Sequence, residues 1–119
     1  MRSFAFLKKI MERIVERWRN VEALMVERFG KLPDMEGILY LIGINEVGVN
    51  PAGKFTKEQK QDLMHVAVCT LLSKEGYYEF TGRDGDGWPH FRMIKQPVEQ
   101  GLLPQEILLK KCVIEYFGM

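Results

Sequence analysis

The feature that most constrains this sequence is a long apolar repeat near its start. Between about Phe4 and Phe29, apolar side chains recur at alternating intervals of four and three residues, at Leu7, Met11, Ile14, Trp18, Val21 and Met25. This spacing places them along one face of an α-helix. Gly30 then provides a natural C-terminal stop. The sequence therefore predicts a long amphipathic helix within residues 1–30.

A helix of that length is unusual in a chain of 119 residues. Helices in globular proteins average about 10–14 residues, and one small core cannot use a much longer apolar stripe along its whole length. We therefore expect part of the stripe to pack against a second copy of the chain. On this hypothesis residues 1–30 are a dimerisation arm and the protein is a homodimer.

The second apolar segment, Met35–Val47, fits either a buried helix or a buried strand. Its centre is a continuous apolar run, and the glycines at positions 37 and 43 disfavour a helix. Asp34 is a good N-cap and Gly48 a good C-terminal stop, at a spacing that suits a helix. The sequence favours the helix on these end signals.

A third helix is predicted to begin at a capping box formed by Thr56 and Gln59, and to end at Gly76. From Leu63 to Leu72 it is apolar on nearly all sides. A helix of this kind has little surface suited to water, so it is expected to lie in the middle of the fold.

A β-hairpin is predicted next, because residues 77–81 and 88–94 flank a glycine-rich stretch with two Asp-Gly turns. Pro89 cannot donate a backbone hydrogen bond, so the second strand should lie at a sheet edge. A last amphipathic helix, with Pro104 in its first turn, is expected to carry Leu103, Ile107, Leu108, Cys112, Ile114 and Phe117. The predicted fold is mainly α within the α+β class: about four helices packed with one β-hairpin in a single domain, residues 1–119.

Polar residues follow one face of the third helix. They recur at intervals of four, three and four residues, at Glu58, Asp62, His65 and Cys69. A charge on an otherwise apolar helix is costly unless it is solvated, paired or bound to metal. The sequence therefore raises two readings of this face, a metal site or a structural one.

In the metal reading, Asp62 and His65 bind one divalent ion and Glu46 supplies a third ligand. His90 joins them if the hairpin folds back over the helix. Two imidazoles with carboxylates suit zinc, manganese or iron. In the structural reading, Asp62 is solvated near the helix start, His65 satisfies a hydrogen bond in the core, and His90 is an exposed edge residue. Structural arrangements of this kind are more common than metal sites.

Several functions are disfavoured by composition and by missing motifs. Lys and Arg total 17 against 16 Asp and Glu, so no net field favours nucleic acid. The chain lacks a phosphate-binding loop, a Gly-x-Ser-x-Gly elbow and a Cys-x-x-Cys pair. The Asp84–Gly87 stretch lacks the ligand pattern of a calcium loop and is interpreted as a turn.

The expected location is cytoplasmic. The apolar stretch before Lys8 is too short for a signal peptide, and no run approaches the ~20 residues of a membrane span. Cys69 and Cys112 both lie in apolar stretches, where a free thiol acts as a small hydrophobe. This fits a reducing compartment.

Four segments, with Leu41–Gly43 upstream, resemble a small group of uncharacterised bacterial proteins: Phe55–Glu58, Asp62–Cys69, Gly76–Tyr78 and Asp86–His90. The similarity spans about residues 37–94. It implies a bacterial source and no fold, activity or cofactor. On the residues alone, a structural or protein-interaction role is favoured over an enzyme, and the alternative is a metalloprotein.

Overall fold

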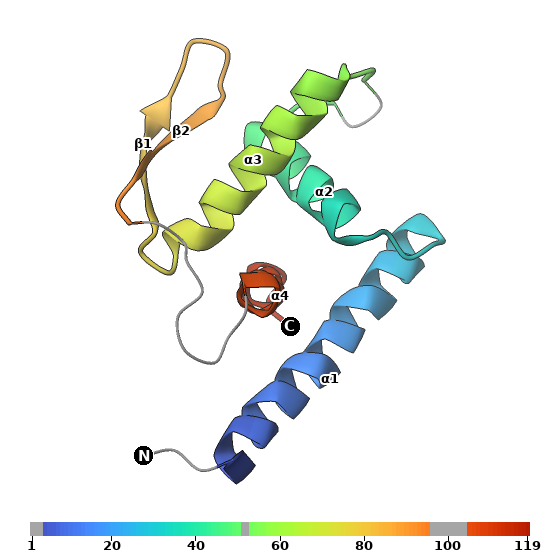
Figure 1. Ribbon diagram of the computed structural model, residues 1–119. Helices are drawn as coiled ribbons and strands as arrows, with labels where there is room; N and C mark the ends of the chain where they lie inside the picture. Colours follow the sequence, from blue (N-terminus) through green and yellow to red (C-terminus); the bar gives the residue numbers. More distant parts are fainter. Residues whose placement is uncertain (1–3, 51–52, 96–104) are drawn as a thin grey trace. The chain divides into compact units, whose positions relative to one another are not determined.

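The structure is a computed structural model that describes residues 4–50, 53–95 and 105–119 (Figure 1). The described chain forms four helices and one antiparallel hairpin, in the order α1 (Phe4–Phe29), α2 (Met35–Val47), α3 (Lys57–Ser73), β1 (Tyr78–Arg83), β2 (Pro89–Met93) and α4 (Gln105–Tyr116). This confirms the predicted mainly α fold of the α+β class. The chain divides into two compact units: one contains α1 and α4, and the other contains α2, α3 and the hairpin.

In the first unit, α1 has the bounds that the apolar repeat predicts. Val21 and Met25, in the second half of the stripe, are buried, whereas Trp18 is only half-buried. The Lys110 ammonium of α4 lies over the Trp18 ring, 5.4 Å from its centroid. The stripe is therefore covered only in part, and the Trp18 indole keeps some exposed surface.

Helix α4 supplies three buried side chains to this unit, Cys112, Val113 and Ile114. The end of the chain is tied to α1, because the Nε of Arg17 donates to the carbonyl oxygen of Met119 at 2.8 Å. Of the residues expected in this helix, Leu103 and Pro104 lie outside the described residues, and Phe117 follows the last helical residue.

In the second unit, residues 35–47 form a helix and not a strand. The Asp34 carboxylate accepts a hydrogen bond from the backbone N–H of Gly37 at 2.8 Å. At the other end Gly48 has a φ of +82°, and its N–H donates to the carbonyl of Ile44 at 2.9 Å. Both predicted end signals are thus used, and they decide between the two readings of the apolar run.

Gly43, which counts against a helix by propensity, is the point at which α2 meets α3. A Cβ at this position would lie 2.1 Å from the carbonyl oxygen of Leu63 and 2.6 Å from its carbonyl carbon. Only glycine allows the two backbones to approach so closely. The residue that weakens the helix locally is the one that allows the helix pair to pack.

Helix α3 begins at the predicted capping box, with Thr56 Oγ1 accepting from the Gln59 N–H at 3.1 Å and the Gln59 side chain accepting from the Thr56 N–H at 2.8 Å. Within its unit it lies between α2 and the hairpin (Figure 1). Its buried side chains are Leu63, Val66, Ala67, Cys69, Leu71 and Leu72. The central position expected from its composition is confirmed within this unit.

The hairpin differs from expectation at its turn. Strand β1 continues through Gly82 and Arg83, which were predicted to belong to the turn. The prediction is wrong because the register shifts between Phe80 and Gly82, so one extra residue is accommodated and pairing resumes beyond it. The Arg83 guanidinium donates to the carbonyls of Gly87 at 2.8 Å and Glu46 at 3.0 Å, which ties the hairpin to the end of α2.

Candidate functional site

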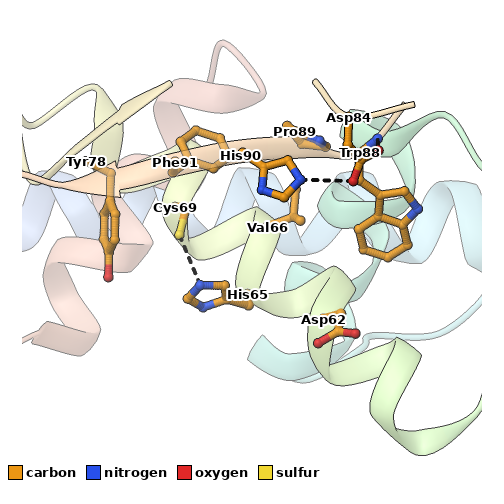
Figure 2. Close-up of a pocket in the computed structure, with 10 residues that line it drawn as sticks. All are labelled: Asp62, His65, Val66, Cys69, Tyr78, Asp84, Trp88, Pro89, His90 and Phe91. Carbon is orange, nitrogen blue, oxygen red and sulfur yellow. Dashed lines mark hydrogen bonds and ion pairs between the residues drawn. The ribbon is translucent and has the colours of Figure 1, made fainter. Parts of the chain in front are cut away.

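A pocket of about 280 Å³ lies between α3 and the hairpin (Figure 2). The described residues that line it are Asp62, His65, Val66 and Cys69 from α3 and Tyr78, Asp84, Trp88, Pro89, His90 and Phe91 from the hairpin and its turn. The hairpin thus folds over α3, as the metal hypothesis required, and brings His90 to the same pocket as His65. Asp62 also lines this pocket.

His65 and Cys69 are one helical turn apart, and the Cys69 Sγ and His65 Nε2 atoms lie 3.5 Å apart, within hydrogen-bond distance for sulfur. Cys69 is only 2% exposed, and burial raises the pKa of its thiol to about 11. The thiol is therefore protonated at neutral pH. Because the thiolate is the nucleophilic form, this pair does not present an activated cysteine.

Asp84 organises the turn between the strands. Its Oδ1 accepts from the backbone N–H groups of Asp86 at 2.9 Å and Trp88 at 3.0 Å. Its Oδ2 lies 2.9 Å from His90 Nε2. The hydrogen bonds from His90 and then from the Trp88 N–H lower the pKa of Asp84. The Asp84 carboxylate thus binds the backbone of the turn and the His90 imidazole, which agrees with the interpretation of this loop as a turn.

Glu46 does not join the other predicted metal ligands. It is half-buried near the end of α2, where its carbonyl accepts from Arg83, and it is not among the pocket-lining residues. Across the described ranges no group of three or more His, Cys, Asp and Glu residues is placed to hold a metal ion. The four-residue set of Glu46, Asp62, His65 and His90 is therefore not assembled in this structure. The metal site stays a prediction, and it would require these side chains to move.

The aromatic lining was not singled out from the sequence as part of a site. Tyr78 and Phe91 belong to the hairpin, where the register pairs Tyr78 with Met93 and Phe80 with Phe91. Directly paired residues share a face of the sheet, so strand alternation was the signal that could have found this wall. Burial, and then the nearby Cys69, raise the pKa of Tyr78.

A second candidate surface lies on α1. A groove between α1 and α4 has Met11, Ile14, Val15, Trp18, Arg19, Glu22, Ile107 and Lys110 along it. A shallower groove beside it is lined by Lys8, Met11, Glu12, Val15, Glu16 and Arg19. The two grooves share Met11, Val15 and Arg19, so they form one continuous surface, called here the α1 groove. Val15 at its centre is 51% exposed.

Compared with known proteins, the chain matches no family model, no curated protein and no solved structure. The resemblance to a group of bacterial proteins therefore stays a prediction. No helix in the described ranges is long and apolar enough to cross a membrane.

Proposed function

We propose that the chain is a protein-interaction domain that works as a homodimer, with α1 as the dimerisation element. The observation that carries the proposal is the α1 groove, which has Val15 at its centre. Farther along α1, Val26 and Phe29 are 46% and 50% exposed. Val15 and Val26 are eleven residues apart, so they point in nearly the same direction from the helix axis. An apolar line of this kind favours a helical partner.

The charges beside this line suit an antiparallel arrangement of two α1 helices. In an antiparallel pair with its two-fold axis at Val15, two residues lie opposite each other when their numbers add up to about 30. Lys8 then lies opposite Glu22 of the partner subunit, and Glu12 lies close to Arg19 of the partner subunit. A parallel arrangement would instead place like charges together, which is unfavourable. The order of charges along α1 thus favours the antiparallel orientation.

The ends of the same line are also complementary. Phe4, which is 92% exposed, falls opposite Val26 of the partner subunit in this register. The 26 residues of α1 span about 39 Å, which allows contact over several helical turns. In a two-fold symmetric dimer every such contact occurs twice, once on each side of the axis.

Light scattering after size exclusion tests the proposal, because a dimer of a 13.9 kDa chain has a mass near 28 kDa, twice 13.9. Lys8→Glu should weaken dimerisation about tenfold, since two attractive pairs become repulsive. Adding Glu22→Lys should restore it. Lys9→Glu is the matched control, since it makes the same charge change on a neighbouring residue that does not line the α1 groove.

A monomeric mass for the unmodified protein at all micromolar concentrations would contradict the proposal. An equal effect of Lys8→Glu and Lys9→Glu would show that net charge matters and the register does not.

A metalloprotein remains the second candidate, favoured by the position of Asp62, His65 and His90 around one pocket. It has less support because the donors are not arranged as a ligand set. Elemental analysis of untagged protein purified without chelator tests it. One equivalent of zinc, manganese or iron, lost on His65→Ala, would favour this function. Metal-free protein whose melting temperature is unchanged by added zinc, manganese or iron would remove it.

A further inference from the structure

We propose that the pocket between α3 and the hairpin binds an organic cation, an ammonium or guanidinium group carried on an apolar stem. The inference is independent of dimerisation through α1. Its first support is the charge of the lining residues, which include the carboxylates of Asp62 and Asp84 and neither lysine nor arginine. A site with this balance attracts cations and repels anions.

The second support is the aromatic wall. Tyr78, Trp88 and Phe91 all line the pocket. In Figure 2 Trp88 and Asp62 lie toward one end and Tyr78 toward the other. A cation over an aromatic face is attracted by the ring quadrupole, and its alkyl stem gains from contact with apolar side chains. A ring and a carboxylate near the same end suit a charged head group there.

The third support is that the two carboxylates differ in their existing partners. Both oxygens of Asp84 are engaged, by two backbone N–H groups and by His90. Asp62 is exposed, and its carboxylate has no hydrogen bond or ion pair with any residue in the described ranges. Asp62 is therefore the anion that remains available to a ligand, whereas Asp84 shapes the wall.

The same residues suit an organic cation better than a metal ion. A metal needs several donors in a fixed geometry, and no three such donors cluster in the described part of the chain. An organic cation needs one carboxylate and ring faces, with looser geometry. The volume of about 280 Å³ lies near the lower end of small-molecule sites, which run from about 300 to 1,000 Å³. It suits one arginine or lysine side chain or a free amine of that size.

Titration with 1-butylguanidinium, followed by two-dimensional NMR of labelled protein, tests the inference. We expect saturable shifts of the Trp88 indole N–H and of α3 amides near Asp62, with a Kd of about 1 mM that weakens in salt. Uncharged butylurea has the same stem and should bind at least tenfold more weakly. Asp62→Asn should weaken 1-butylguanidinium binding about fivefold. Glu58→Gln, one turn earlier on α3 and outside the pocket, should leave it unchanged.

The source of the cation is distinguished by a second probe, an acetylated Ala-Arg-Ala amide. Binding tenfold tighter than 1-butylguanidinium would assign the pocket to an arginine side chain of a protein partner, and equal binding would assign it to a free small molecule. Three results would overturn the inference: equal binding of butylurea, unchanged affinity in Asp62→Asn, or pocket shifts with zinc ion and none with 1-butylguanidinium.

Discussion

Replacing Gly43 by alanine tests the packing of the second unit most directly. The added Cβ would lie 2.1 Å from the Leu63 carbonyl oxygen, and its three nearest atoms all belong to the Leu63 backbone. A backbone cannot turn aside as a flexible side chain does. Restoring ordinary contact at 3.4 Å requires α2 and α3 to separate locally by about 1.3 Å, the difference between 3.4 and 2.1.

The cost follows from what α2 buries, which is Ile38, Leu39, Ile42 and Ile44 besides Gly43. Each fully buried side chain of this kind is worth about 1.5–3 kcal/mol, so the four are worth about 6–12 kcal/mol. A gap of roughly 1 Å forfeits about a quarter to a half of such contact energy. The higher helix propensity of alanine relative to glycine offsets about 1 kcal/mol of this loss. We expect a net loss of about 3 kcal/mol in the free energy of unfolding.

Guanidinium titration followed by circular dichroism measures this loss. Gly85→Ala is the control, because its Cβ would meet nothing within 4 Å and its effect should stay within about 0.5 kcal/mol. An unchanged or higher transition midpoint for Gly43→Ala would refute the argument. It would mean that α2 and α3 do not approach at this residue, or that the pair has room to shift without losing contact.

Three further outcomes follow from the described contacts. Folding lowers the pKa of Asp84, so the ionised carboxylate stabilises the folded state above the unfolded pKa of 3.8, and this stabilisation is lost as the pH falls. The melting temperature should therefore change less between pH 6 and pH 3 in Asp84→Asn than in the unmodified protein. The Cys69 pKa is raised from 9.0 to about 11, so stability is complete below pH 9 and falls by at most about 2.7 kcal/mol as the pH rises to 11. Thiolate absorbance of a Cys112→Ala variant should have its midpoint near 11, and a midpoint near 9 would contradict the burial of this thiol. Trp18→Ala should cost about 2 kcal/mol in chemical denaturation, less than the roughly 3–5 kcal/mol of a buried indole, because the ring is half-buried beneath Lys110.

Features that depend on neighbours in the chain could be predicted from the sequence. The bounds of α1 follow from its repeat, the start of α2 from Asp34, and the start of α3 from Thr56 and Gln59. Each signal acts within one helical turn, where the backbone itself brings the groups together. The contact between His65 and Cys69 is predictable for the same reason, since the two residues are four apart on one helix.

The candidate site was predictable in part. Asp62 and His65 share the predicted helix face, and the fold-back of the hairpin brings His90 to it. The role of Asp84 as the partner of His90 could not be read, because it depends on a turn closed by the carboxylate and on a shift in strand register. The register sets which residues face each other, and a single extra residue changes every later pair.

The sequence by itself determined the bounds of α1 and α2 and the start of α3, because capping and periodicity are local properties of the chain. Only the tertiary structure decided what those elements do to each other. It places the carbonyl of Glu46 against Arg83 and leaves Glu46 out of the pocket. It also makes Gly43 a packing residue, although its propensity counts against a helix. Both outcomes depend on the angle and depth at which separate elements meet, and these are set by the whole surface buried between them and not by any short stretch of residues.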